Sequence, residues 1–291
     1  MQQTTLRAPC HLYGKGLHTG RHTHVTLLPA PPDTGVWFRV FAGGRQVEFP
    51  ATHEWVVRTT MSTCLGRDDA QICTVEHLLA ALAGLEIDNV VIESDGAEVP
   101  AMDGSAQPFV ARIMEVGRRV QPAPRSYIKV LAPIVVESDD KIASLHPAVT
   151  PSYSFLIDFD NPGIQTQALK VFLTPQTFVA QLAKARTFGF IADLQNLQSK
   201  GLALGAGLEN AVGLDPQGAV LNPDGLRYSD EFVRHKILDA IGDLFLAGAP
   251  ILAEYRGVKS GHQLNHRLVK RMAELPDHWE IVSASAEAQA V

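Results

Sequence analysis

Two residues four positions apart, His235 and Asp239, have the types and spacing from which a metal site could be built. They lie in a stretch whose apolar residues recur with helical periodicity, so their side chains share one face, about 6 Å apart along the axis. Imidazole and carboxylate groups are both zinc ligands. Because a surface ion pair has the same spacing, the pair by itself leaves both interpretations open.

A second segment of the chain supplies a candidate third ligand, His77. Residues Glu76–Gly84 align without gaps with Arg234–Gly242, and each segment has a histidine near its start and a glycine seven positions later. Both histidines adjoin apolar stretches, in which a polar side chain needs a partner, and Asp243 extends the polar stripe that contains Asp239. Two histidines and one carboxylate leave the fourth position of a tetrahedral ion open to water, which is typical of catalytic zinc.

Glu76 and His262 are the candidates for proton transfer. Glu76 precedes a candidate zinc ligand, and a carboxylate there could take the proton of a water whose pKa the ion lowers to about 7. The alternative for Glu76 is a glutamate favoured in the first turn of a helix by the helix dipole. His262 follows Gly261, and this glycine predicts a turn that presents the imidazole at the tip of a helix.

Helices and strands that could position these side chains are predicted in both halves of the chain by apolar periodicity and turn residues. In the first half we expect strands at 24–28, 35–40, 46–49 and 89–93, and helices at 74–85 and 106–116. In the second half we expect strands at 127–136, 153–158 and 251–256, and helices at 175–184, 230–246 and 262–274. The Pro-rich residues 121–125 predict a connector and a domain boundary.

The predicted fold is α+β with two similar domains, residues 1–122 and residues 127–275. Each domain is expected to be a small β-sheet layered with helices. The internal similarity of the two histidine segments predicts that the helices of the two domains pack together between the sheets. Residues 276–291 are expected to form a tail that is frayed after Val282.

Composition excludes several classes of protein. Of the 291 residues, 46% are hydrophobic and 19% are charged, which is ordinary for a globular protein. A net charge of −6 without a basic block argues against nucleic-acid binding. The longest apolar stretch, 244–253, is shorter than the roughly 20 residues of a membrane span, and no leader pattern is present, so a cytoplasmic protein is expected. Three cysteines without a CxxC motif predict free thiols.

Six strings in the sequence carry a family resemblance: GLHTG, TVEHLLAALAGLEIDNVVIE, MDGSAQPF, ARTFGF, DGLRYSDEFVRHKILDAIGDLFLAG and KSGHQLNH. Together, and in order from about Leu6 to Val269, they resemble the UDP-3-O-acyl-N-acetylglucosamine deacetylases of lipid A biosynthesis. The resemblance implies a cytoplasmic enzyme with one Zn²⁺ that removes the acetyl group of UDP-3-O-(3-hydroxyacyl)-N-acetylglucosamine as acetate. It also implies a monomer; the same ligands could hold Fe²⁺.

The resemblance assigns roles to particular residues. The zinc ligands of the family fall on the three residues already reached from spacing, its base on Glu76 and its general acid on His262. Asp243 matches the carboxylate that orients and charges that histidine. Thr187 matches a hydroxyl that stabilises the oxyanion, and Lys236 matches a substrate-binding lysine.

Further residues correspond to the substrate-binding part of the family site. Phe188 matches an aromatic side chain that lines it, Met61 a residue near the zinc cleft and His18 a histidine close to the site. A βαβ insert that forms a passage for the acyl chain is expected near residues 190–212, although a plain core helix has the same composition. The sequence departs from many relatives at His146, where a lysine is frequent, so a titratable group replaces a fixed charge.

Two other functions remain as alternatives. One is a zinc hydrolase that acts on another acylated amino sugar, which the metal residues alone do not separate from the first. The other is a non-catalytic protein that binds a sugar nucleotide or an acyl chain. The presence of Glu76, Thr187 and His262 together argues against the non-catalytic alternative.

Overall fold

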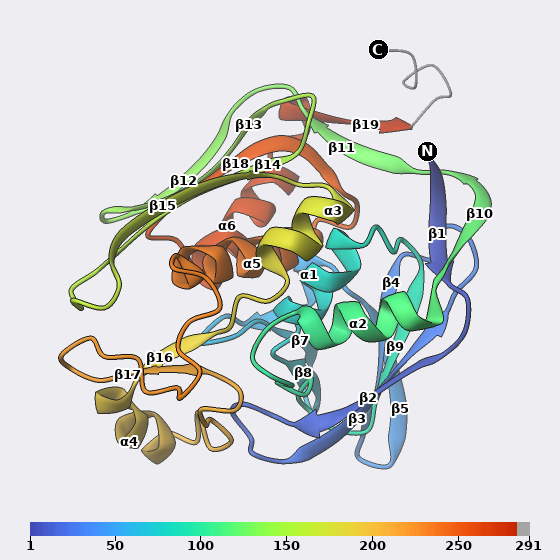
Figure 1. Cartoon of the computed structure of the whole chain (residues 1–291). Helices are drawn as coiled ribbons and strands as arrows, with labels where there is room; N and C mark the ends of the chain where they lie inside the picture. The colour runs from blue at the N-terminus through green and yellow to red at the C-terminus, as the bar shows by residue number, and fades with distance from the viewer. Residues whose placement is uncertain (284–291) are drawn as a thin grey trace.

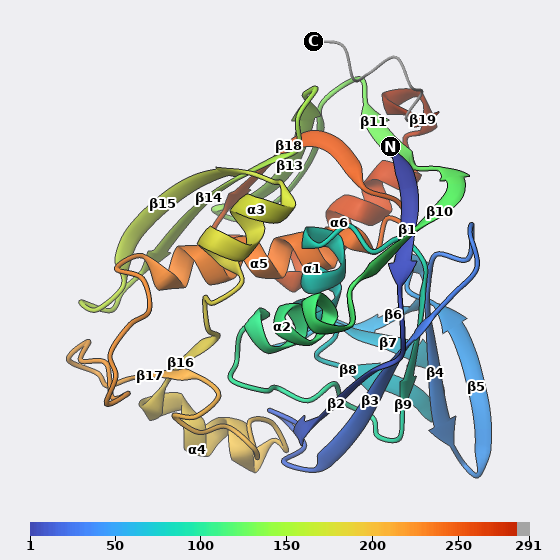
Figure 2. The ribbon, with the colours of Figure 1, turned by 45° about the vertical axis from the view of Figure 1, so that its right-hand side comes forward.

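The computed structural model describes residues 1–283 and has a mixed α+β fold with several β-sheets. Two large sheets lie on opposite sides of the molecule, and helices fill the space between them (Figure 1). A turned view shows the same layers, with the large sheet of the first half of the chain below the helices and the large sheet of the second half above (Figure 2). None of the described helices is long and apolar enough to cross a membrane.

The first half of the chain builds a five-stranded sheet in the order β2-β3-β9-β4-β5. Its strands alternate buried and exposed residues, as expected of a sheet with one face on the core. The bounds are Cys10–Lys15 for β2, His22–Pro29 for β3, Val36–Ala42 for β4, Arg45–Pro50 for β5 and Val90–Ser94 for β9. Helices α1 (Glu76–Gly84) and α2 (Gln107–Val116) lie near the predicted positions.

A small three-stranded sheet leads into α1 and corrects one prediction. It consists of β6 (Val56–Arg58), β7 (Cys64–Arg67) and β8 (Ala70–Cys73). The register of β7 and β8 places Cys64 directly opposite Cys73, with a Cα–Cα distance of 4.0 Å, and the two sulfur atoms are bonded. The prediction of free thiols is therefore wrong for this pair, because hairpin register brings together two cysteines that no short motif links. Cys10 is a buried free thiol.

The Pro-rich segment predicted to be a connector is a strand. Strand β10 (Arg118–Pro124) pairs antiparallel with β1 (Gln2–Leu6) in a separate two-stranded sheet. Proline donates no backbone hydrogen bond, but a strand with only one neighbour tolerates it at non-donating positions. The prolines of this segment therefore indicated a linker, but pairing with β1, which is distant in the sequence, makes the segment a strand.

The second half of the chain builds a seven-stranded sheet in which β18 (Ile251–Val258) pairs with three others. The remaining strands are β11 (Ser126–Val130), β12 (Ile134–Ser138), β13 (Lys141–Pro147), β14 (Ser152–Phe159), β15 (Gln165–Phe172) and β19 (Trp279–Ser283). The run predicted at 127–136 is thus two strands. The segment assigned to a tail begins with a 3-10 turn and β19, which pairs with β11; its residues after 283 lie outside the described part.

Helices α5 (Glu231–Phe245) and α1 pack directly against each other between the sheets. Their close approach depends on Gly242, because a Cβ atom at this position would lie 2.0 Å from the backbone oxygen of Glu76. Helix α6 (His262–Ala273) packs against α5 and against β12. Three helices therefore bring their side chains toward one region of the interior.

The segment between the large sheet and α5 is less regular than predicted. In place of one helix at 175–184, a single turn α3 (Pro175–Thr177) continues as a π-helix, Phe178–Leu182. Strands β16 (Phe188–Phe190) and β17 (Val212–Leu214) then pair in parallel, with α4 (Ile191–Ser199) between them. No residue of α4 is buried, so α4 lies on the surface and is not a core helix.

Candidate active site

His77, His235 and Asp239 come together where α1 and α5 cross. Nε2 of His77 and Nε2 of His235 lie 3.4 and 3.3 Å from Oδ1 of Asp239. The two imidazole rings meet edge to face, with their centroids 4.9 Å apart. All three side chains are buried, and one ligand atom from each lies within 4.8 Å of the others. The three residues selected by spacing thus converge on one point.

The donor atoms of this cluster fit a zinc ion. Oδ1 of Asp239 is buried and has no hydrogen-bond partner among residues 1–283, although a buried carboxylate oxygen needs one or a cation. Nδ1 of His235 lies 3.1 Å from the carbonyl oxygen of Ala185; it therefore carries the proton and leaves the lone pair of Nε2 facing Asp239. Burial lowers the pKa of His235 to about 4, so the ring is neutral, as a ligand must be.

Lys236 lies beside the cluster and contacts its carboxylate. Its Nζ is 2.5 Å from Oδ2 of Asp239, the oxygen that does not lie between the histidines. Burial alone would raise the pKa of Asp239, but the neighbouring His235 and Lys236 hold it well below its usual value. Asp239 is therefore ionised, with one oxygen paired with a lysine and the other unpaired among the described residues.

Glu76 and His262 face this cluster from α1 and α6. Oε1 of Glu76 lies 3.8 Å from Nε2 of His262, and the same nitrogen lies 4.0 Å from Oδ2 of Asp239. Oε2 of Glu76 accepts a hydrogen bond of 3.1 Å from the backbone N–H of Thr63. Burial raises the pKa of Glu76, which strengthens this carboxylate as a base.

Asp243 binds the opposite edge of the His262 ring. Its Oδ2 lies 2.9 Å from Nδ1 of His262. Burial would lower the pKa of His262, but the carboxylates of Asp243 and Glu76 outweigh it and raise the pKa to about 9. His262 is therefore an imidazolium at neutral pH, held between two acidic side chains.

Thr63 and Asn265 also bind Asp243, and sequence reasoning missed both. Oγ1 of Thr63 donates to Oδ1 of Asp243 (2.7 Å), and Nδ2 of Asn265 donates to Oδ2 (2.9 Å). Asn265 follows His262 by three residues in a predicted helix, so its shared helix face was a usable signal. No local pattern pointed to Thr63.

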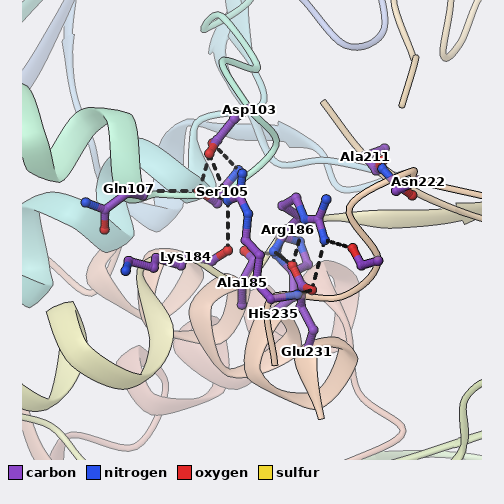
Figure 3. A network of polar contacts seen from close by, with 12 residues as sticks. Asp103, Ser105, Gln107, Lys184, Ala185, Arg186, Ala211, Asn222, Glu231 and His235 are labelled. Atoms are coloured by element: carbon purple, nitrogen blue, oxygen red, sulfur yellow. Dashed lines mark hydrogen bonds and ion pairs between the residues drawn. The ribbon is translucent and has the colours of Figure 1, made fainter. Parts of the chain in front are cut away.

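The segment that carries Thr187 and Phe188 is fixed by a buried ion pair (Figure 3). Nε and the backbone N–H of Arg186 lie 2.8 and 3.0 Å from Oε1 of Glu231, which is fully buried. Oε2 of Glu231 accepts from the backbone N–H of Arg227. This pair holds Ala185, whose carbonyl oxygen binds His235.

Thr187 and Phe188 follow directly on this anchored segment. The backbone N–H of Thr187 donates to the carbonyl oxygen of Gly104 (2.8 Å). Phe188 packs edge to face on Phe232, with centroids 5.0 Å apart, and on His235, with centroids 6.4 Å apart. Phe188 therefore lies beside His235, and Thr187 precedes it in the chain.

His18 and Met61 make no hydrogen bond or ion pair with the three metal-site residues in the described structure. His18 is buried, and its Nδ1 accepts from the backbone N–H of Ala203, while its Nε2 has no hydrogen-bond partner in the described part of the chain. Met61 has a left-handed backbone with φ of 65° and a side chain that is 52% exposed. His146 lies on β13, with Nε2 3.0 Å from Oγ of Ser144.

Two buried imidazoles and a carboxylate, with a second carboxylate and an imidazolium facing them, define the class of metal-dependent hydrolases. The ion would be the electrophile, and the two facing groups would be base and acid.

Comparison with known proteins gives the family. A family model described as UDP-3-O-acyl N-acetylglycosamine deacetylase matches residues 3–274. The deacetylase of that name from Myxococcus xanthus is 48% identical over 282 residues, 97% of this chain and 90% of the relative. The one from Pseudomonas entomophila is 47% identical over 284 residues, 97% and 93% of the two chains. The one from Shewanella halifaxensis is 47% identical over 291 residues, 99% and 95% of the two chains.

The chain therefore belongs to the UDP-3-O-acyl-N-acetylglucosamine deacetylase family, the zinc-dependent amide hydrolases of lipid A biosynthesis. The resemblance seen in the six sequence strings is confirmed. The cluster of His77, His235 and Asp239 is consistent with the metal that this family requires.

Proposed function

We propose that this chain hydrolyses the N-acetyl group of UDP-3-O-(3-hydroxyacyl)-N-acetylglucosamine, with zinc held by His77, His235 and Asp239. The observation that carries the assignment of the ligands is the buried, unpaired Oδ1 of Asp239 between two imidazole nitrogens. When bound, zinc lowers the pKa of water and polarises the amide carbonyl. The remaining chemistry belongs to side chains of the chain itself.

Glu76 is the general base of the proposal. Its Oε2 is held by the backbone N–H of Thr63, so Oε1 is the oxygen left to receive the proton of the attacking water. Burial raises the pKa of Glu76, and a base whose pKa approaches the working pH transfers protons more effectively.

His262 is the general acid. Nδ1 is bound to Asp243, so Nε2 is the nitrogen that faces the metal cluster and can give its proton to the leaving amine. A pKa of about 9 keeps this ring protonated at neutral pH. The released amine thus leaves as a neutral group, Glu76 gives the proton it took from water to solvent, and His262 is reprotonated from solvent.

Five other side chains are proposed to bind the substrate or its oxyanion. The hydroxyl of Thr187 makes no hydrogen bond within the described residues and is therefore available to the developing oxyanion. Phe188 supplies an apolar wall beside His235. Lys236, Met61 and His18 are assigned to substrate binding from their correspondence with the family; the unpaired Nε2 of His18 supports this for His18.

We also propose that residues 1–122 and 127–275 are two similar domains related by duplication. In support, the equivalent glycines of the two histidine segments both sit at close contacts: Gly84 against Phe178 and Gly242 against the backbone of α1. Each half also contributes one large sheet on one side of the helices. The monomeric state and the cytoplasmic location expected from the sequence remain part of this proposal.

The segment β16-α4-β17 is proposed to form the passage for the acyl chain. Its parallel pairing with a helix between the strands is the βαβ arrangement expected near residues 190–212. Ile191, Leu204 and Leu208 expose between 44% and 48% of their surface in and near this segment. Exposed apolar side chains that follow an active-site aromatic residue are a suitable lining for a hydrocarbon chain.

A deacetylation assay with metal analysis tests the proposal. We expect one zinc per chain, release of acetate from the UDP-linked acylated sugar, and loss of both activity and zinc with a chelator. Turnover of a different acylated amino sugar in place of this one would favour the first alternative function. Stable binding of the substrate without release of acetate in the zinc-loaded protein would favour the non-catalytic alternative.

A further inference from the structure

The carboxylate of Asp243 is surrounded by hydrogen-bond donors. Oδ1 accepts from the hydroxyl of Thr63 at 2.7 Å, and Oδ2 accepts from Nδ1 of His262 and Nδ2 of Asn265, both at 2.9 Å. Asp243, Thr63 and Asn265 are each at most 2% exposed. Because both oxygens accept hydrogen bonds and neither donates, the ionised form of Asp243 is the one that fits its surroundings.

The orientation of the Asn265 amide is determined by its other partners. Its Oδ1 accepts from the hydroxyl of Tyr255 at 2.7 Å and from that of Ser260 at 2.8 Å. If the amide were reversed, its oxygen would face the carboxylate of Asp243 at 2.9 Å, and two acceptors would repel each other. Nδ2 must therefore donate to Asp243, and the two hydroxyl groups hold it in that position.

Thr63 links the proposed base to the partner of the proposed acid. Its hydroxyl donates to Asp243 on α5, and its backbone N–H donates to Oε2 of Glu76 on α1 at 3.1 Å. The residue lies just before β7, outside the three helices that carry the metal cluster and its two facing groups. One threonine thus fixes two carboxylates on different helices.

We propose that Thr63 and Asn265 are positioning residues for deacetylation, which together keep Oδ2 of Asp243 aimed at Nδ1 of His262. The contact keeps a proton on Nδ1 and directs Nε2 toward Glu76 and Asp239, at 3.8 and 4.0 Å. Without these donors the carboxylate could rotate, and the imidazole would lose its fixed direction. The inference rests on the role of His262 as general acid in the proposed function.

Substitution of Thr63 separates positioning from stability. Thr63→Val removes the hydroxyl, keeps the branched shape and retains the backbone N–H that binds Glu76; Thr63→Ser restores the hydroxyl. In the zinc-loaded enzyme we expect Thr63→Val to lower kcat by about 10- to 100-fold, with KM and zinc content unchanged. Thr63→Ser should recover most of the turnover. If Thr63→Val lowered the melting temperature and left kcat unchanged, the hydroxyl would have only a structural role, and the proposal would be overturned.

The tautomer of His262 gives a second readout that does not depend on turnover. Nitrogen-15 NMR of the neutral ring in the zinc-loaded protein should show the proton on Nδ1 in the wild type. Thr63→Val, and Asn265→Ala where it folds, should show a mixture of the Nδ1-H and Nε2-H forms. One unchanged tautomer in Thr63→Val would contradict the proposal.

A double substitution distinguishes failure of this inference from failure of the proposed function. If His262 is the acid and Thr63 acts through it, Thr63→Val should slow His262→Ala no further, because coupled residues do not add. Full additivity of the two changes would overturn the inference and leave the acid role intact. Wild-type turnover in His262→Ala would instead refute the acid role on which the inference rests.

Discussion

Oε1 of Glu76 lies 3.8 Å from Nε2 of His262, although one side chain comes from α1 and the other from α6. The contact exists because α5 packs against both helices and carries Asp239 and Asp243 between them. A carboxylate whose pKa is raised thus faces an imidazolium across the metal cluster. In the proposed mechanism, Glu76 is the base and His262 is the acid.

The first prediction concerns Glu76. Glu76→Gln keeps the size of the side chain and removes its basic oxygen, so turnover should fall by about 10²- to 10⁴-fold. Zinc content, measured in the same samples, should stay near one per chain, because Glu76 is not one of the three ligands. Turnover close to that of the wild type with zinc still bound would show that another group takes the proton.

The second prediction concerns the pH dependence set by Asp243. His262 must be protonated to act, so the alkaline limb of kcat should fall as the pH rises through its pKa of about 9. Asp243→Asn removes the negative charge of Asp243 beside the imidazolium of His262. Only Glu76 and Asp239 then counter the effect of burial, so the pKa of His262 should fall.

The alkaline limb of kcat should therefore move to lower pH in Asp243→Asn and should vanish in His262→Ala. Profiles of kcat against pH, recorded at saturating substrate for the wild type and both variants, measure this shift. An alkaline limb at the same pH in all three proteins would exclude His262 as the titrating acid.

The third prediction concerns the contact between α1 and α5. Gly242→Ala places a Cβ atom 2.0 Å from the backbone oxygen of Glu76, so the helices must separate. We expect a loss of about 1–3 kcal/mol in the free energy of unfolding and weaker zinc binding. Gly189→Ala is the matched control, since its Cβ would meet no atom within 4 Å. Equal denaturation midpoints for the two variants would contradict the packing argument.

The fourth prediction concerns the ion pair between Arg186 and Glu231. Arg186→Lys keeps the charge but loses the forked hydrogen bonds from Nε and Nη2 of Arg186 to the two carboxylate oxygens of Glu231. The carbonyl oxygen that orients His235 is then less well fixed, and zinc affinity should fall by about 10- to 100-fold.

A competition titration with a chelator measures this change in zinc affinity. Arg112→Lys, at an exposed ion pair with Glu115, serves as the control and should bind zinc as the wild type does. If Arg186→Lys melted at a lower temperature but bound zinc with wild-type affinity, the ion pair would have no role in orienting the ligand.

Local sequence patterns were sufficient for the helices that carry the metal cluster. Residues four apart on one helix share a face, so His235 and Asp239 could be paired without a structure. The similarity of the two histidine segments then pointed to His77, and their crossing brought all three together. The family resemblance added expected roles that residue spacing does not predict, such as stabilisation of the oxyanion by Thr187.

Long-range pairing accounts for most of what the sequence did not reveal. Strand β10 exists because β1 lies beside it, and the bond between Cys64 and Cys73 depends on the register of a hairpin. Thr63 reaches Asp243 only because the loop before β7 lies against α5. Some of these contacts join segments that are far apart in the chain, and others depend on the register of strand pairing. Local periodicity carries no information about long-range contacts or about register.

The central claim is that His77, His235 and Asp239 hold one zinc ion, and anomalous X-ray scattering at the zinc edge tests it most directly. In crystals of the zinc-loaded protein we predict one strong peak per chain about 2.0–2.2 Å from Nε2 of both histidines and from the carboxylate of Asp239. A peak at any other set of side chains, or none in a protein that deacetylates its substrate, would contradict the account.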